Sequence, residues 1–292
     1  MSKYTFTESN YEQAIIELFR DQLGYEYIYG PDIERDYAEP LFLERLQQSL
    51  LAINPSLPEV AIHEAIEKIR QIDTGSLVQR NEVFTDYLQN GVDVAYFDGK
   101  EQRATCVRLI DYEQPQRNNF VVANQWSIEE HSVRRADVIV FINGLPLVVM
   151  ELKSPSRTET NVSEAYAQLR NYMQEIPSLF VYNAFCVMSD LVTSKAGTIT
   201  SGEDRFMEWK TVDGQAEDNH FANFHVLFCG MFEHERLIEI IRDFICFSKD
   251  EKQSAKILAG YHQFYAVRKA IASAKEATTT NGKGGVFWHT QG

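Results

Sequence analysis

Two carboxylates and a lysine near the middle of the chain have residue types and a spacing suited to binding a metal ion. Glu151 and Lys153 end the apolar run "VVMELK" (148–153), and Asp137 precedes them in the pattern D-x13-E-x-K. Charged side chains are rarely buried in an apolar strand without a partner or a function. Neighbouring carboxylates repel each other, and a bound divalent cation removes that repulsion. Oxygen ligands with an incomplete shell suit Mg²⁺, which binds phosphate oxygens and lowers the pKa of an attacking water.

Whether these side chains meet depends on the turn between two predicted strands, which centres on residues 143–144 of "RADVIVFINGLPLVVMELK". Side chains alternate between the two faces of a strand, so the pairing register decides which residues share a face. A two-residue turn pairs Ile142 with Leu145. Without any later irregularity, that register points Glu151 away from Asp137.

A three-residue loop, 142–144, is the alternative, and it is the one we predict. It pairs Phe141 with Leu145 and places Gly144 in the left-handed position of a bulge. Both acids and the lysine then share one face. The backbone carbonyl of Leu152 becomes a further candidate metal ligand, and the lysine can position the attacking water or stabilise developing negative charge. The competing interpretation is an ordinary cross-strand salt bridge, because E-x-K at a strand end is common.

The periodicity around this hairpin predicts an α/β protein. Apolar residues at helical spacing predict helices within 8–23, 41–53, 58–72, 81–91, 161–176, 234–247 and 261–274. Alternation predicts strands within 25–30, 119–128 and 183–190, and a hairpin over 92–112 that turns at Asp98-Gly99. We expect turn-rich chain at 190–220, a charged break at 249–257 and a polar linker at 275–285.

The composition is that of a soluble globular protein, with 44% hydrophobic and 24% charged residues. A net charge of −14 argues against a simple nucleic-acid-binding domain, although an acidic, metal-dependent nuclease remains compatible with it. No run approaches the roughly 18–20 apolar residues of a membrane span. The four cysteines are scattered and the polar N-terminus lacks a signal peptide, so we expect a cytoplasmic protein with reduced thiols.

The segment "RRADVIVFINGLPLVVMELKSP" (134–155) closely resembles the PD-(D/E)-x-K nuclease motif of the restriction (HsdR) subunit of type I restriction enzymes. In that family "NGLPLV" followed by "ELK" is a recurring string. Ala136 stands where the motif usually has proline, a departure that is common in such nucleases. The resemblance implies that Asp137 and Glu151 bind metal and that Lys153 assists catalysis.

Two further segments resemble the same family. "NYEQAIIELFRDQLGYEY" (10–27) is similar to its first helix, whose glutamate corresponds best to Glu12, a possible extra metal ligand, with Glu8 as the competitor. "QLRNY" fits a Q-x-x-x-Y element, which implies that Gln168 and Tyr172 support the site and contact the DNA backbone. From the residues alone, a solvated helix face for Gln168 and partial burial for Tyr172 explain them equally well.

The C-terminal segment "GGVFWHTQG" (284–292) is similar to the strand and loop that open the helicase motor of this family. There the expected continuation S-G-K-[ST] completes a phosphate-binding loop. The resemblance implies that Thr290 and Gly292 belong to an ATP site and that Gln263, in "YHQFYAVRKA", reads the adenine. The competing interpretation of Gln263 is a polar residue on an amphipathic helix.

Taken together, the resemblance implies a restriction-endonuclease-like mixed β-sheet flanked by helices in a nuclease domain, 1–248, and the start of an ATP-dependent motor domain, 249–292. The expected activity is Mg²⁺-dependent cleavage of double-stranded DNA, coupled to ATP-driven translocation in a longer protein. The expected partners are methyltransferase and specificity subunits, with no membrane. The alternatives are a repair or recombination nuclease–helicase with the same core, and a catalytically silent module that docks a motor.

Overall fold

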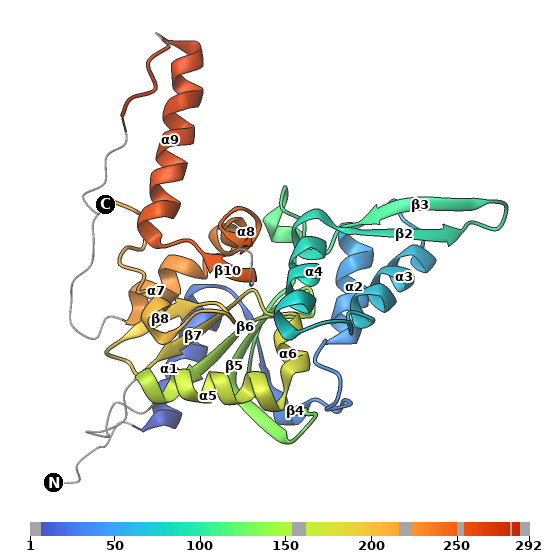
Figure 1. Ribbon diagram of the computed structural model, residues 1–292, viewed down its shortest axis with the longest axis horizontal. Helices are drawn as coiled ribbons and strands as arrows, with labels where there is room; N and C mark the ends of the chain where they lie inside the picture. Colours follow the sequence, from blue (N-terminus) through green and yellow to red (C-terminus); the bar gives the residue numbers. More distant parts are fainter. Residues whose placement is uncertain (1–6, 154–161, 216–223, 250–253, 281, 287–292) are drawn as a thin grey trace.

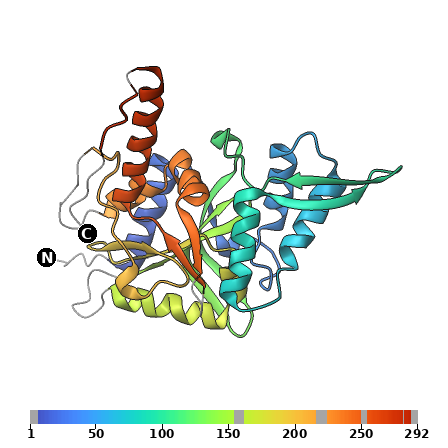
Figure 2. The ribbon, with the colours of Figure 1, turned by 45° about the horizontal axis from the view of Figure 1, so that its top comes forward.

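The structure is a computed structural model that describes residues 7–153, 162–215, 224–249, 254–280 and 282–286. A central mixed sheet has helices on both faces. A helical lobe with a protruding β-hairpin extends from one side, and a long C-terminal helix points away from the sheet (Figures 1 and 2). The predicted α/β class, with a mixed sheet flanked by helices, is confirmed.

The central sheet has six strands in the order β1-β4-β5-β6-β7-β8. The strands are β1 (Glu26–Tyr29), β4 (Phe120–Glu129), β5 (Val133–Ile142), β6 (Leu145–Leu152), β7 (Phe185–Ser189) and β8 (Ser194–Gly197). β1 runs parallel to β4 and β6 runs parallel to β7, whereas the other neighbours are antiparallel. The strands that carry the candidate residues, β5 and β6, therefore lie at the centre of the sheet.

Two apolar cores hold the helices against the sheet. One face packs against α1 (Glu8–Glu17), α7 (Phe224–Met231) and α8 (His234–Asp243), with Val138, Val140 and Met150 contributed by the central strands. The other face packs against α5 (Val162–Glu175) and α6 (Pro177–Val181). Because both faces are covered, the residues of β6 are buried throughout, which explains why the sequence there reads as a continuous apolar run.

The lobe beside the sheet consists of three helices and the predicted hairpin. The elements are α2 (Leu43–Ile53), α3 (Glu59–Arg70), α4 (Leu77–Asn90), β2 (Val92–Phe97) and β3 (Gln102–Val107). β2 and β3 pair antiparallel around the Asp98-Gly99 turn, as predicted, and project from the lobe (Figure 1). The lobe and the sheet share the first apolar core, so the lobe packs directly against the sheet.

Three strands were not predicted, because long-range pairing decides each of them. β8 lies in the segment that we expected to be turn-rich. β9 (Ile245–Lys249) begins inside the predicted helix, and β10 (Ser254–Leu258), in the expected charged break, pairs with it. The final helix, α9 (Tyr261–Thr279), runs into the expected linker, since Lys275, Glu276 and Ala277 are good helix formers. The strand predicted near the C-terminus falls mainly in 287–292, outside the described residues.

The turn between β5 and β6 has two residues, so the predicted three-residue loop is wrong. Ile142 pairs with Leu145, and both turn residues have positive φ, 54° at Asn143 and 80° at Gly144, as in a type I′ turn. The register then shifts by one residue between the Phe141–Pro146 and Val140–Val148 pairs. This shift is a bulge that leaves Leu147 as the extra residue. It restores the shared face that we had expected the loop to provide.

Buried contacts select the two-residue turn. Asn143 is fully buried, and its side chain donates to the carbonyl of Leu109 and accepts from the backbone N–H of Asn119. Gly144 lies against the start of α2, where an added Cβ would be 2.5 Å from the Leu46 nitrogen. The turn is therefore fixed by segments distant in the sequence, and a third loop residue has no room.

Candidate active site

β5 and β6 separate where the candidate residues lie. Val138–Met150 is the last pair in their ladder on this side, although both strands continue beyond it. In place of a further backbone pair, Asp137 Oδ2 accepts a hydrogen bond of 2.8 Å from the backbone N–H of Leu152. Asp137 therefore lies in the fork between the two strands, beside the residue that follows Glu151.

Glu151 and Lys153 lie on the other arm of the fork. Glu151 is only 3% exposed, and its Oε1 accepts a hydrogen bond from Lys153 Nζ. The same ammonium lies 3.2 Å from the carbonyl oxygen of Leu152. Glu151 Oε2 is buried and has no hydrogen-bond partner among the described residues. The site thus contains a desolvated carboxylate oxygen that is ready to accept a further ligand.

The charges of the fork are unbalanced. Burial, followed by the charge of Glu151, raises the pKa of Asp137 well above its usual range. Burial also raises the pKa of Glu151, although Lys153 opposes this change. Burial would lower the pKa of Lys153, but the Glu151 carboxylate outweighs it and keeps the ammonium charged. A half-buried acid and a buried acid, Asp137 and Glu151, thus share one cation, which favours uptake of a proton or a second cation.

A hard divalent cation such as Mg²⁺ fits these residues better than structural zinc, which is usually bound by Cys and His. The available donors are all oxygens: the Asp137 and Glu151 carboxylates and the Leu152 carbonyl. In the part of the chain that the structure describes, no three His, Cys, Asp or Glu side chains converge closely enough to hold an ion. A metal here would rely on two carboxylates, a carbonyl and waters, which is the coordination that Mg²⁺ commonly accepts.

Glu12 reaches the site from α1. Its two carboxylate oxygens accept hydrogen bonds from Asn124 Nδ2 at 2.6 Å and from Gln125 Nε2 at 2.8 Å. Burial raises the pKa of Glu12, while these amides act to lower it. Its charge also contributes to the raised pKa of Asp137, so the two acids lie within electrostatic reach. Glu8, the competing candidate, is exposed one turn earlier.

Tyr172 and Gln168 lie on α5, and Tyr172 borders the fork. The Tyr172 hydroxyl donates to the carbonyl of Arg135 at 3.0 Å, which ties the helix to β5. Burial and then the charge of Glu151 raise the pKa of Tyr172. Gln168, one turn earlier, lies beside the same hydroxyl and acts to lower that pKa. Tyr172 is 4% exposed, more deeply buried than its sequence alone indicated.

Sequence reasoning missed three residues of this region, Asn124, Gln125 and Ser189. Asn124 and Gln125 interrupt the apolar strand "FVVANQWSI", and this polar pair was the only local signal of a role. The backbone carbonyl of Ser189, at the end of β7, accepts a hydrogen bond of 2.8 Å from the backbone N–H of Lys153 and so fixes the lysine at the end of its strand.

Gln263 is the one residue predicted to bind nucleotide that the structure describes, and it lies away from the fork. Gln263, in the first turn of α9, accepts a hydrogen bond of 2.9 Å from the Gly260 N–H and so caps the helix. It also lines a hollow of about 480 Å³ with β10 and side chains from segment 200–207. Thr290 and Gly292 fall outside the described residues, as does the N-terminal segment 1–6.

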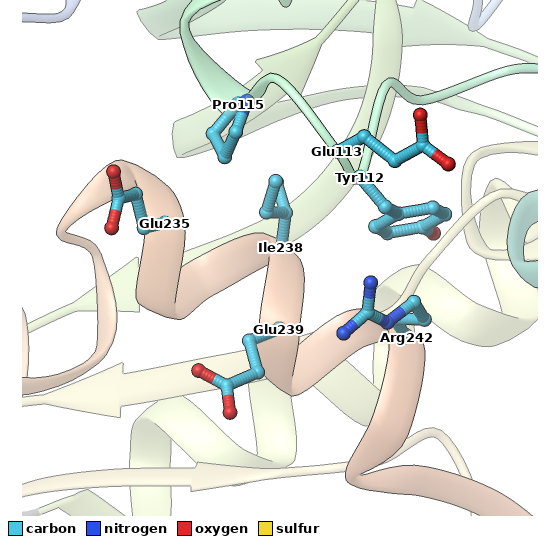
Figure 3. A pocket seen from close by; sticks show the side chains of 7 residues that line it. All are labelled: Tyr112, Glu113, Pro115, Glu235, Ile238, Glu239 and Arg242. Atoms are coloured by element: carbon cyan, nitrogen blue, oxygen red, sulfur yellow. The ribbon is translucent and has the colours of Figure 1, made fainter.

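A second hollow, of about 260 Å³, lies between α8 and the connection that precedes β4 (Figure 3). It is lined by Tyr112, Glu113, Pro115, Glu235, Ile238, Glu239 and Arg242. The Arg242 guanidinium lies over the Tyr112 ring, 5.4 Å from its centroid, while glutamates surround the opening. Its acidic lining does not suit a phosphate backbone, and none of the fork residues borders it.

The mixed sheet and the two acids and lysine at the end of its central hairpin are compatible with the PD-(D/E)-x-K motif that the sequence resembles. The model of the family "Type I restriction enzyme R protein N terminus" matches residues 5–205. The chain belongs to this family.

Curated relatives agree with the family assignment. The chain is 36% identical to the type I restriction enzyme HindI endonuclease subunit of Haemophilus influenzae over 98% of its own length. It is 31% identical to the putative type I restriction enzyme MjaIXP endonuclease subunit of Methanocaldococcus jannaschii over 96% of its length. It spans only 28% of the first relative and 29% of the second. Among the described residues, no helix is both long and apolar enough to cross a membrane.

Proposed function

We propose that this chain is the nuclease part of the endonuclease subunit of a type I restriction enzyme, where it cleaves double-stranded DNA with Mg²⁺. The observation that carries the proposal is the convergence of Asp137, Glu151 and Lys153 at the fork between β5 and β6. The matching family and relatives named as endonuclease subunits support it. The net charge of −14 gives the chain little capacity to bind DNA alone. In this proposal, as the family resemblance implies, a specificity subunit recognises the DNA sequence.

In the proposed reaction Asp137, Glu151 and the Leu152 carbonyl would hold a Mg²⁺ ion, which would supply charge stabilisation and a water of lowered pKa. Lys153 is positioned by Glu151 and by the Leu152 carbonyl, so its ammonium can orient the attacking water or neutralise a phosphoryl oxygen. The water oxygen forms a bond to phosphorus as the bond to the leaving oxygen of the cleaved strand breaks. The attacking water loses a proton to solvent, and the leaving oxygen takes one up.

Gln168 and Tyr172 have supporting roles in this proposal. Tyr172 fixes α5 on β5 through the Arg135 carbonyl and lies beside Glu151. Gln168, half-buried on the same helix face, is available to a DNA backbone that enters along α5. Phosphate contacts of this kind position DNA without reading its sequence.

The remainder of the longer protein is proposed to be an ATP-driven motor that moves DNA toward this nuclease. In that proposal residues 1–248 form the nuclease domain and 249–292 begin the motor, with Gln263, Thr290 and Gly292 in its ATP site. The β9–β10 hairpin pairs residues from both sides of this boundary and so ties the two parts together. The complex would be cytoplasmic and include methyltransferase and specificity subunits.

The deciding experiment is DNA cleavage by the full-length subunit in its complex, with Mg²⁺ and ATP. We expect Asp137→Ala and Lys153→Ala to abolish cleavage while ATP hydrolysis continues. Thermal unfolding of each variant establishes that it is folded. Cleavage that survives both substitutions would favour the silent docking module. Cleavage that needs no methyltransferase subunit would favour a repair nuclease–helicase.

The coding sequence after Gly292 tests the motor separately. We expect S-G-K-[ST] to follow "HTQG" directly, because the lysine and backbone N–H groups of that loop bind the phosphates of ATP. A different continuation would remove the support for ATP-driven translocation and leave the nuclease proposal in place.

A further inference from the structure

Strand β4 has a kink directly beside the fork. Gln125 has φ 55°, in the left-handed region that residues other than glycine seldom adopt. The pairs Asn124–Val138 and Trp126–Ala136 flank it, so Gln125 lies level with Asp137 on the neighbouring strand. Strained backbone of this kind persists only where the surroundings enforce it, and it is frequent at functional sites.

The turn that follows β1 enforces the kink. A Cβ added at Gly30 would lie 2.8 Å from the Asn124 carbonyl oxygen and 2.9 Å from that of Gln125. The backbone of Gly30 is thus pressed directly against the kinked peptide units, which only glycine permits. The strain is therefore held by contacts between two segments distant in the sequence.

The kink brings two successive side chains to the same carboxylate. In a regular strand, neighbouring side chains point to opposite faces, so Asn124 and Gln125 could not both reach Glu12. Here Asn124 donates to one oxygen of Glu12 at 2.6 Å and Gln125 donates to the other at 2.8 Å. The Tyr27 hydroxyl donates to Asn124 Oδ1 at 3.1 Å and orients its amide. Both oxygens of Glu12 are thereby fixed in place.

We propose that the Asn124–Gln125 kink is a positioning device that holds Glu12 toward Asp137, where Glu12 acts as an outer carboxylate for the divalent cation. Glu12 is half-buried on α1, and the kink lies level with Asp137. Among the described residues no three acids converge closely enough to bind one ion, so Glu12 would act on the ion from outside its direct ligands. Such outer partners usually tune metal affinity. The inference rests on the proposed function, because it requires a cation at the fork.

The test compares Mn²⁺ binding by variants of the 292-residue chain, measured by electron paramagnetic resonance. Gln125→Met replaces the side chain with an unbranched one of similar length but removes the amide that donates to Glu12. We expect it to weaken Mn²⁺ binding roughly 10-fold, the usual effect of losing an outer partner. Gln13→Met is the matched control, because Gln13 donates to Glu17 at 3.0 Å on the exposed side of α1. Its Mn²⁺ affinity should equal that of the wild type.

A double-mutant cycle separates positioning from a merely structural role. In the Glu12→Gln background, Gln125→Met should change Mn²⁺ affinity less than about twofold, since there is no carboxylate left to position. If Gln125→Met weakens Mn²⁺ binding equally in both backgrounds, this inference alone is overturned. The same holds if Gln125→Met weakens binding in neither background while Asp137→Ala abolishes it. Binding that is insensitive to Asp137→Ala overturns the metal site and this inference together.

Discussion

Asp137 is bound to the backbone of the strand that carries the other acid: its Oδ2 accepts a 2.8 Å hydrogen bond from the Leu152 N–H. The first acid of the site therefore depends on the register of β6 for its position. That register is set at the turn and the bulge, several residues from any charged group. Changes at the turn are thus expected to act on the site.

Gly144→Ala should destabilise the chain and weaken metal binding at the fork. Its φ of 80° disfavours any side chain, and the new Cβ would lie 2.6 Å from the Phe42 carbonyl oxygen. We expect backbone strain alone to cost about 1–3 kcal/mol in the free energy of unfolding, measured with urea. Gly99→Ala is the matched control, since φ is 94° there but nothing lies within 4 Å of the Cβ. An equal loss in both variants would show that packing against α2 is irrelevant.

Metal binding at the fork should release a proton. Burial and the charge of Glu151 raise the pKa of Asp137, so the metal-free pair retains a proton above the usual range of carboxyl groups. A cation must displace that proton, so Mn²⁺ affinity should increase as the pH rises through the raised pKa. Calorimetry in buffers of different ionisation enthalpy measures the protons released. A release that is unchanged in Asp137→Asn would contradict this assignment.

Lys256 should make the stability of the chain depend on pH. It is buried, and burial lowers its pKa from 10.5 to about 7, although its ammonium reaches Asn81 Oδ1 and the Asn183 carbonyl. The unfolded chain then binds one more proton than the folded chain between these two pKa values, so stability rises with pH across that window. We expect Lys256→Met to lose this rise in urea unfolding from pH 7 to 10.

The control for that experiment is Lys249→Met. Lys249 is an exposed lysine on the same hairpin, paired with Glu82 at 2.7 Å. Its removal should leave the pH dependence intact, because an exposed ion pair contributes little to stability. If both variants keep the rise, another group causes it.

Tyr172→Phe should reduce DNA cleavage by the complex more than it reduces stability. The substitution removes the hydrogen bond to the Arg135 carbonyl, worth about 0.5–1.5 kcal/mol of stability, and the hydroxyl beside Glu151. We expect the cleavage rate to fall roughly 10-fold, which is the smallest effect usually seen when an outer partner of a metal site is lost. Tyr166→Phe, which removes a 3.3 Å bond to the Ser201 carbonyl from the same helix, should cleave normally. Equal losses in both variants would assign Tyr172 a purely structural role.

The sequence by itself determined the local elements and the identity of the candidate residues. Helical periodicity located the helices from α1 to α5, and the Asp98-Gly99 and Asn143-Gly144 pairs marked both hairpins. The D-x13-E-x-K spacing identified the two acids and the lysine. These features depend on residues close together in the chain, so periodicity and turn chemistry are sufficient to reveal them.

Only the tertiary structure decided how those residues meet. The turn at Asn143 is fixed by Leu109 and Asn119, and the bulge at Leu147 then returns both acids to one face. The kink at Gln125 is enforced by Gly30. β8, β9 and β10 exist because distant segments pair, and their sequences alone read as loop, helix end and charged break. Each of these outcomes depends on contacts between segments far apart in the sequence, which local patterns of residues do not encode.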